Sequence, residues 1–378
     1  MEQKVSNQFE AIFNTTQGNL YSAAGRINLI GEHTDYNEGF VMPGAIDKVM
    51  VAKILPTESS MVKVYAIDLD EMGEFDPYVE CELEQSWLRY IYGVCREVIK
   101  RGGNVEGFKA AFSGSVPLGS GLSSSAALES VFAFAINDLF NENTIDKMEL
   151  ARIGQSTEHN YCGVKCGIMD QFASIFGLEG NLIRLDCRSM EYEYLPFDAK
   201  GYRLVLLNTC VKHELVDSPY NRRRESCERV AATLGMPSLR GATMEQLDAV
   251  KGKISEEDYS RARFVIGEEQ RVYTVSDALK AGDMERVGKA MYQTHDGLSG
   301  DYEVSCEELD FLANVAKECG VTGARMMGGG FGGCTINLVK DEAYDSFIET
   351  ALAKYKAQYG IDAEVIAVNI KNGAQKLG

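Results

Sequence analysis

Hydrophobic residues recur at every third or fourth position over several long stretches, which is the spacing of one buried helical face. The clearest case is 124–140, where Leu128, Val131, Phe132, Ala135 and Leu139 fall on one face of a predicted helix. The same pattern predicts helices at 7–14, 149–161, 306–319 and 341–359, and through most of 221–299.

Other stretches are rich in β-branched and aromatic residues and predict strands at 108–113, 203–208, 335–339 and 363–370. The runs 49–55 and 62–67 are separated by Pro-Thr-Glu-Ser-Ser, which predicts a β-hairpin. Because strands and helices do not alternate regularly, we expect an α+β fold and not a doubly wound α/β sheet.

The length of 378 residues exceeds what one hydrophobic core supports, so two domains are expected. The first half is richer in predicted strands and the second in predicted helices, which places the boundary near 175–200. We take 1–180 as the N-terminal domain and 181–378 as the C-terminal domain, which carries a glycine-rich loop.

The charge balance narrows the range of partners. The chain has 38 Lys and Arg against 56 Asp and Glu, a formal net charge of −18. This argues against general binding of nucleic acid and against docking on anionic membranes. The longest apolar run, Val131 to Ile136, is far too short to span a membrane. We expect a monomer whose partners are small molecules.

The ten cysteines are scattered, and none form a CxxC pair. This distribution indicates reduced thiols and not a disulfide framework. Cys162 and Cys166 have few histidines nearby, which does not favour a zinc site. The N-terminus lacks the apolar core of a signal peptide, so a cytoplasmic protein is expected.

The strongest local signal is Val-Pro-Leu-Gly-Ser-Gly-Leu-Ser-Ser-Ser-Ala-Ala at 116–127, between a predicted strand and a predicted helix. Gly119 and Gly121 allow close approach of the backbone to a ligand. Ser123, Ser124 and Ser125 stand at the helix start, where free N–H groups and the helix dipole favour an anion such as phosphate. The segment is not a Walker A loop, and a plain serine N-cap is the simpler alternative.

A second glycine-rich segment, Gly-Gly-Gly-Phe-Gly-Gly at 328–333, formally matches GxGxxG. A strand follows it, whereas a dinucleotide fingerprint precedes a helix, so NAD binding is disfavoured. The glycines predict a loop that passes very close to another group, or else a tight turn between strands.

Two polar clusters complete the candidate chemistry. The stretch 25–39 gathers Arg26, Glu32, His33 and Asp35, a set suited to the hydroxyl groups of a sugar and to phosphate, or to a solvated turn. The stretch 158–171 places Asp170 among apolar residues, where a carboxylate needs either an ion-pair partner or a chemical role.

These segments together resemble a known family. Gly-Arg-Ile-Asn-Leu-Ile-Gly-Glu-His-Thr-Asp-Tyr-Asn-Glu-Gly at 25–39 is similar to the galactokinase signature. The segments 116–127 and 328–333 resemble the second and third motifs of the galacto-, homoserine, mevalonate and phosphomevalonate kinases. CGIMDQ at 166–171 and VKHELVDSPYNRRR at 211–224 resemble two further galactokinase segments. The order and spacing fit from about residue 20 to 370.

The resemblance implies a two-domain kinase with its active site between the domains and a left-handed β-α-β unit in the N-terminal domain. It also implies roles for residues at matching positions. Arg26 and Asp170 are the expected catalytic pair, and Ser125 and Glu158 the expected magnesium ligands. The expected galactose contacts are Glu32, His33, Asp35, Gly167, Asp170 and Tyr220. The expected nucleotide contacts are Trp87, Pro117, Leu118, Gly119, Ser120, Gly121, Leu122, Ser123, Ser124, Ser125 and Ala126.

Two positions depart from the family pattern. Ala24 stands where the family usually has proline, and Gly44 stands where it usually has an apolar side chain. Neither removes a reacting group, but Gly44 is expected to loosen the sugar pocket.

The implied reaction moves the γ-phosphoryl group of ATP, with Mg²⁺, to the anomeric hydroxyl of galactose. Alternatives with the same chemistry are 1-kinases of N-acetylgalactosamine, galacturonate or arabinose. A non-catalytic sugar sensor is disfavoured, because such relatives lack a Ser-Ala pair that is present here within 123–127. The run Arg222-Arg223-Arg224 brings positive charge to the site or forms a solvated helix face.

Overall fold

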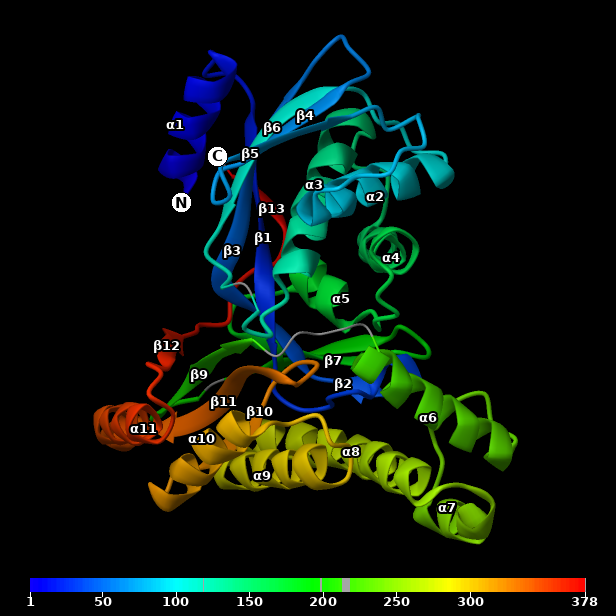
Figure 1. The fold of residues 1–378 in the computed structure, drawn as a ribbon, viewed down its shortest axis with the longest axis vertical. Coiled ribbons are helices and arrows are strands. Elements are labelled where there is room, and N and C mark those ends of the chain that lie inside the picture. The colour runs from blue at the N-terminus through cyan, green and yellow to red at the C-terminus, as the bar shows by residue number, and fades with distance from the viewer. Residues whose placement is uncertain (118, 198, 213–217, 378) are drawn as a thin grey trace.

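The computed structural model describes residues 1–117, 119–197, 199–212 and 218–377, which form two lobes (Figure 1). A six-stranded sheet in the order β13-β1-β3-β6-β4-β5 forms the centre of the upper lobe. Its strands are β1 (Asn19–Asn28), β3 (Pro43–Pro56), β4 (Val62–Ala66), β5 (Glu71–Phe75), β6 (Phe108–Gly114) and β13 (Gln375–Leu377).

Helices cover both faces of this sheet (Figure 1). One face carries α1 (Glu2–Phe13), and the other carries α2 (Ser86–Lys100), α3 (Ser124–Phe140), α4 (Lys147–Thr157) and α5 (Met169–Phe176). A π-helical turn, Glu158–Cys162, continues α4. The helix predicted at 124–140 is confirmed with the same bounds. Its apolar residues are buried around most of its circumference.

The predicted hairpin between 49–55 and 62–67 is wrong. Strand β6 lies between β3 and β4, pairing antiparallel with β3 and parallel with β4. Phe108, Ala110 and Ala111 of β6 have no exposed surface, so this strand belongs at the centre of a sheet. The short link between β3 and β4 therefore crosses β6, a strand that comes later in the sequence.

The lower lobe is built on a four-stranded antiparallel sheet in the order β10-β11-β9-β12. Its strands are β9 (Tyr202–Lys212), β10 (Gly323–Met326), β11 (Gly332–Lys340) and β12 (Glu364–Ala367). The helices of this lobe are α6 (Ser218–Leu234), α7 (Met244–Val250), α8 (Glu256–Ala281), α9 (Met284–Gly300), α10 (Glu307–Glu318) and α11 (Tyr344–Tyr359). The predicted helical content of 221–299 is thus confirmed, as four separate helices.

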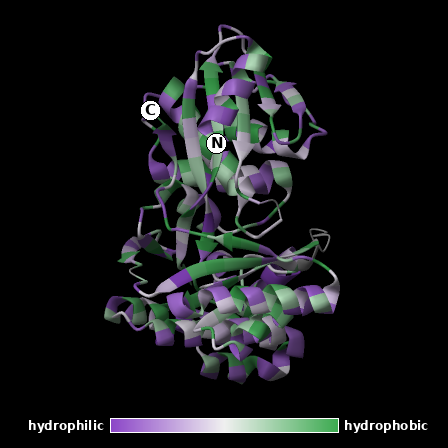
Figure 2. Ribbon diagram, turned by 90° about the vertical axis from the view of Figure 1, so that its left-hand side faces the viewer, coloured by the Kyte–Doolittle hydropathy of each residue, from purple (hydrophilic) through white to green (hydrophobic). Residues whose placement is uncertain are grey.

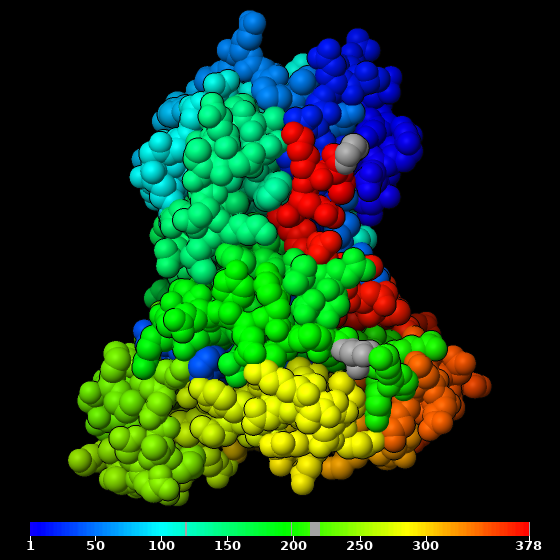
Figure 3. Space-filling model, turned by 180° about the vertical axis from the view of Figure 1, so that it is seen from behind, coloured from blue at the N-terminus to red at the C-terminus, as the bar shows by residue number. Residues whose placement is uncertain are grey.

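A third sheet, in the order β2-β7-β8, lies where the lobes meet (Figure 1). Its strands are β2 (Phe40–Val41), β7 (Asn181–Asp186) and β8 (Tyr192–Pro196). From the lower lobe the chain returns to pair β13 with β1, and Figure 3 shows these last residues set among the N-terminal ones. The lobes therefore do not correspond to one cut in the sequence, and the boundary at 180/181 stays a prediction.

The core follows the hydropathy of the elements. Strands are mostly hydrophobic, whereas helices alternate hydrophobic and hydrophilic residues (Figure 2). Phe132 and Ile136 of α3 have no exposed surface and pack on the sheet side of the upper lobe. Within the described residues, no helix is both long and apolar enough to cross a membrane. This arrangement leaves the polar motifs gathered where the two lobes meet.

Candidate active site

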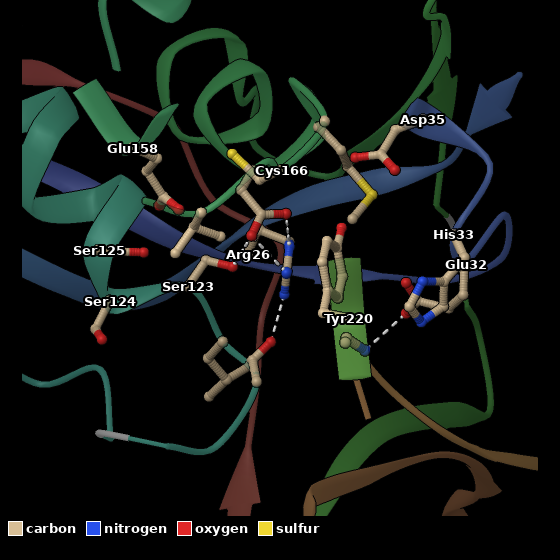
Figure 4. Close-up of a pocket in the computed structure, with 18 of the residues that line it drawn as sticks. Arg26, Glu32, His33, Asp35, Ser123, Ser124, Ser125, Glu158, Cys166 and Tyr220 are labelled. Atoms are coloured by element: carbon tan, nitrogen blue, oxygen red, sulfur yellow. Dashed lines mark hydrogen bonds and ion pairs between the residues drawn. The ribbon is translucent and has the colours of Figure 1, made fainter. Parts of the chain in front are cut away.

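A cavity lined by residues of both lobes brings the sequence motifs together (Figure 4). The serines at the start of α3 and Glu158 lie at one end, and Tyr220, His33, Glu32 and Asp35 lie at the other, with Arg26 between. The lining residues are Arg26, Glu32, His33, Asp35, Pro117, Gly119, Gly121, Leu122, Ser123, Ser124, Ser125, Glu158, Val164, Cys166, Gly167, Met169, Asp170, Tyr220, Gly328 and Gly329.

Arg26 and Asp170 form a two-bond ion pair at the middle of the cavity. Nε and Nη2 of Arg26 each donate to a different Asp170 oxygen, at 2.7 Å in both cases. The remaining nitrogen, Nη1, donates to the Gly121 carbonyl, and the Ser123 hydroxyl donates to Asp170. Burial opposes the charge of Arg26, but the carboxylates of Asp170, Glu32 and Asp35 together outweigh it and raise the pKa of the guanidinium. The pair is therefore fixed in orientation by several bonds.

The serine-rich segment turns the N-terminus of α3 toward the cavity. Ser123 precedes the helix with a positive φ of 60°, and Ser124 begins it. Gly119 and Gly121 also have positive φ, of 73° and 76°, which only glycine adopts without strain. Free N–H groups at the start of a 17-residue helix thus face the space between the lobes, an arrangement that suits phosphate groups.

The glycine-rich loop at 328–333 lies directly against this serine-rich segment. A Cβ at Gly328 would approach the Gly121 carbonyl oxygen to 3.3 Å, and a Cβ at Gly333 would approach Ser120 to 3.2 Å. Gly330 leaves even less room, since a Cβ there would lie 2.1 Å from the Val304 carbonyl oxygen. The predicted close passage is therefore confirmed, and the partner is the serine-rich segment from the other lobe. The alternative, a turn between strands, is confirmed as well, because the loop joins the antiparallel strands β10 and β11.

Glu158 and Ser125 lie side by side at the end of the cavity that is formed by the start of α3 (Figure 4). Burial raises the pKa of Glu158 to about 7, an effect that a hydrogen bond from Ser125 opposes and the Asp170 charge increases. A carboxylate in such a place gains from a nearby cation. Mg²⁺ in nucleotide sites is typically held by one or two carboxylates together with phosphate oxygens and water. Glu158 can supply one such carboxylate, and Ser125 can add a hydroxyl oxygen.

Glu32 is held tightly at the opposite end. Its Oε1 accepts hydrogen bonds from Arg325 Nη1 at 3.0 Å and from the Gly328 amide at 2.8 Å. Among the described residues, no hydrogen bond engages the second oxygen, Oε2. The carboxylate is thus fixed in place with one oxygen free for a ligand.

His33 is a neutral ring in a cage of tyrosines. Its Nδ1 lies 2.7 Å from the Tyr36 hydroxyl, and its ring centroid lies 5.5 Å from that of Tyr220 and 4.9 Å from that of Tyr302. Burial, followed by the charge of Arg223, lowers the pKa of His33 to about 3. Its buried Nε2 has no partner among the described residues, which leaves a polar atom for a ligand hydroxyl.

Asp35 and Gly167 touch at the end of the cavity opposite the serines. A Cβ at position 167 would lie 1.8 Å from Asp35 Oδ2, so glycine is required for this approach. Burial, and then the neighbouring Asp170 charge, raises the pKa of Asp35 to about 7. Asp35 therefore sits at a position where its charge is costly without a hydrogen-bonding ligand.

Several expected contacts lie outside the cavity lining. Trp87 is buried in the upper lobe, where Nε1 donates to Glu71 and the ring packs on Phe112, so its nucleotide contact stays a prediction. Ser120 and Ala126 belong to the serine-rich segment but are fully buried and do not line the cavity. Leu118 lies outside the described residues.

Gly44 does not border the sugar pocket. A Cβ there would lie 2.8 Å from Leu182 and 2.9 Å from Ile370, which are core side chains. The missing side chain therefore makes room for the packing of β3 and does not loosen the cavity.

The arginine run at 222–224 divides between two roles. Arg223 is buried and donates to the carbonyl oxygens of Tyr302 and Glu303, behind the tyrosine cage. Arg224 pairs with Glu228 on the helix surface and donates to the Lys165 carbonyl. Neither prediction describes the whole run. Consecutive residues of a helix point in different directions, so Arg223 is buried while Arg224 lies at the surface.

The sequence did not single out every residue around the site. Val164, Cys166 and Met169 line the cavity within a stretch whose polar members alone were selected. Arg325 and Glu268, which make buried hydrogen bonds to the loop at 28–32, were missed altogether. Arg325 lies three residues before the first glycine of the glycine-rich segment and could have been noticed there, whereas Glu268 lies in a charged helix with no distinguishing signal.

Three family models match the chain. The galactokinase galactose-binding signature covers residues 7–56, the GHMP kinases N terminal domain 89–178 and the GHMP kinases C terminal domain 275–358. The chain is 41% identical to the galactokinase of Thermotoga maritima over 94% of this chain and 99% of that protein. It is 39% identical to the galactokinase of Clostridium acetobutylicum over 99% and 98%.

Solved structures agree with these matches. The galactokinase of Lactococcus lactis, solved in complex with galactose, superposes with a TM-score of 0.94 at 35% identity and covers 98% of both chains. The mevalonate kinase of Methanococcus jannaschii shares the fold, with a TM-score of 0.67 at 17% identity over 94% of this chain and 99% of that one. With the motifs assembled around one cavity and relatives matched over nearly the whole length, this chain belongs to the galactokinase family of GHMP kinases.

Proposed function

We propose that this protein transfers the γ-phosphoryl group of ATP to the anomeric hydroxyl of D-galactose, giving galactose 1-phosphate and ADP. The observation that carries the proposal is the Arg26–Asp170 pair, which stands between a helix N-terminus suited to phosphates and a polar end suited to a sugar. The similarity to galactokinases over nearly the full chain supports the same activity.

Asp170 is the proposed acceptor of the hydroxyl proton, or the group that orients this hydroxyl for attack. Its carboxylate is held by Arg26 and Ser123, so its position relative to an incoming sugar is set before the substrate binds. Arg26 adds a positive charge beside the path of the transferred group. Phosphoryl transfer depends mainly on positioning and charge stabilisation, and these two residues supply both.

The phosphates of ATP are proposed to lie on the serine-rich segment, with Pro117, Gly119, Leu122 and Ser124 as neighbours. Ser125 and Glu158 would hold Mg²⁺, which neutralises phosphate charge when bound. The sugar is proposed to contact Glu32, His33, Asp35, Gly167 and Tyr220. Two polar atoms are proposed to hydrogen-bond with sugar hydroxyls: Nε2 of His33, which is buried without a partner among the described residues, and Oε2 of Glu32, whose other oxygen alone is engaged.

The ten cysteines are all free thiols, which supports a cytoplasmic enzyme. Galactose use in carbohydrate metabolism follows from the proposed activity.

The test is ADP release with MgATP and a panel of galactose, N-acetylgalactosamine, galacturonate, arabinose, glucose, mevalonate and homoserine. Turnover with galactose well above the others is the expected result. Turnover with a different sugar would keep the phosphoryl transfer but overturn the proposed substrate. Binding of ATP and galactose without any turnover would favour a sugar sensor.

A further inference from the structure

The loop that carries Glu32 and His33 rests on a buried carboxylate from the lower lobe. Glu268, on α8, has no exposed surface. Its Oε1 accepts hydrogen bonds from the Gly31 amide at 2.8 Å and from the Glu32 amide at 3.2 Å. Its Oε2 accepts from Arg271 Nε at 2.6 Å and from the Thr294 hydroxyl at 2.7 Å. Both oxygens are therefore engaged, one by the sugar loop and one by the lower lobe itself.

Arg325, on β10, holds the same loop from a second direction. Its guanidinium also has no exposed surface. It donates to the Leu29 carbonyl through Nε at 3.0 Å, to the Asn28 carbonyl through Nη2, and to Glu32 Oε1 through Nη1 at 3.0 Å. A planar fork with this many fixed bonds defines both the distance and the orientation of the residues that it joins.

The loop itself has little freedom to compensate. Gly31 has a φ of 91°, and a Cβ there would lie 2.6 Å from the Phe40 carbonyl oxygen and 3.0 Å from Val272 of α8. The backbone thus passes in direct contact with α8. A shift of Glu268 or Arg325, which we call the clamp residues, would therefore move the Glu32 carboxylate and the neighbouring His33 together.

We propose that Glu268 and Arg325 are positioning residues that set the geometry of the galactose site from the lower lobe. Neither lines the cavity, so they act through residues 28–32 and not by contact with substrate. This inference rests on the proposed function, since it gives Glu268 and Arg325 a role at the end of the cavity where galactose is proposed to bind. The phosphate end is held by other groups, namely Arg26, Ser123 and the glycine-rich loop.

The prediction that follows is a selective effect on sugar affinity. We expect Glu268→Met to raise the KM for galactose, and the Kd for galactose by calorimetry, about ten- to a hundredfold, the range for losing hydrogen bonds to a charged group. The KM for ATP should change by less than about threefold. Glu268→Gln keeps a carbonyl oxygen for the two loop amides, so it should restore most of the lost affinity. Arg325→Lys keeps the charge but loses the fork, and should resemble Glu268→Met.

Asp258→Asn is the matched control. Asp258 is a buried carboxylate on the same helix, but it accepts hydrogen bonds from Ser226 and Arg229 of α6 and not from the loop at 28–32. We expect this variant to lower Tm while leaving the KM for galactose unchanged.

The outcomes distinguish a failure of the proposed function from a failure of the positioning role. If the unaltered protein releases no ADP with galactose, the proposed function fails, and this inference fails with it. If the unaltered protein is active but the clamp variants raise both KM values equally, or lower Tm with normal galactose affinity, only the positioning role is overturned. If Glu268→Met does not fold, Arg325→Lys and Glu268→Gln decide the question by the same ratio of KM values.

Discussion

Arg26 and Asp170, 144 positions apart in the chain, meet through two parallel hydrogen bonds of 2.7 Å each. The arginine comes from β1, where the ladder to β3 is irregular between Ala24 and Arg26, and the aspartate comes from the first turn of α5. Two bonds between planar groups fix their relative orientation as well as their distance. This pairing is the basis of the first two predictions.

Replacing the carboxylate removes the proposed proton acceptor. We expect Asp170→Asn to lower kcat about 10²- to 10⁴-fold, the usual contribution of a positioned base, while ATP still binds. ADP release measures the first effect and titration calorimetry with MgATP the second. Asp341→Asn, which breaks an exposed ion pair with Arg203, is the control and should retain full turnover. Normal turnover in Asp170→Asn would remove this residue from the reaction.

Replacing the Arg26 guanidinium with an amine keeps the positive charge but removes the planar, two-bond contact, and so tests the geometry of the pair. Arg26→Lys cannot make two parallel bonds to Asp170 and also reach the Gly121 carbonyl. We expect kcat to fall at least about tenfold, as for the loss of a hydrogen bond between charged groups. Arg203→Lys is the surface control. Equal kcat in Arg26→Lys and the unaltered enzyme would show that charge alone is sufficient.

Gly167 is predicted to be essential for the sugar end. A methyl group there would overlap Asp35, so Gly167→Ala must displace that carboxylate or the loop. We expect a higher KM for galactose and an unchanged KM for ATP. Gly252→Ala is the control, because a Cβ at that position meets no atom within 4 Å. An unchanged galactose KM in Gly167→Ala would show that the proposed sugar contact at Asp35 is not needed.

The pKa of Asp35 makes stability depend on pH in a defined direction. Folding raises this pKa from about 3.9 in an unfolded chain to about 7, so the folded state binds the proton more tightly. The stabilising effect of the protonated form is complete below about pH 4 and lost as pH rises through about 7. We therefore expect Asp35→Asn to gain stability over the unaltered protein as pH rises from 4 to 8. Urea unfolding across this range measures it, and a gain that does not vary with pH contradicts it.

Glu158 is predicted to govern the metal requirement. At fixed ATP, Glu158→Gln should raise the Mg²⁺ concentration for half-maximal turnover at least about tenfold, by analogy with the loss of metal-site partners. Glu149→Gln is the control, because Glu149 lies in α4, which the turn carrying Glu158 continues, but is paired with Arg101 away from the cavity. The same Mg²⁺ dependence in both variants would rule out Glu158 as a metal ligand.

The local elements were largely readable from the sequence. The helix at 124–140 appears with the predicted bounds, and the motifs at 25–39, 116–127 and 328–333 all reach the cavity. Helical periodicity and glycine-dependent backbone shapes are properties of neighbouring residues, so local sequence specifies them. The resemblance of the motifs then identified the family and its reaction.

Strand pairing was not readable in the same way. The expected hairpin of β3 and β4 is interrupted by β6, and β13 returns from the far end of the chain to pair with β1. Strand order depends on which apolar faces bury one another, and distant segments decide that.

The site, like the strand order, depends partly on local sequence and partly on contacts between distant segments. Sequence alone determined the fold class, the motifs and the residue types that carry the chemistry. The tertiary structure decided that Gly44 packs in the core, that Gly167 touches Asp35, and that Glu268 and Arg325 clamp the sugar loop. Such contacts join residues more than a hundred positions apart, and their partners become neighbours only when the chain has folded.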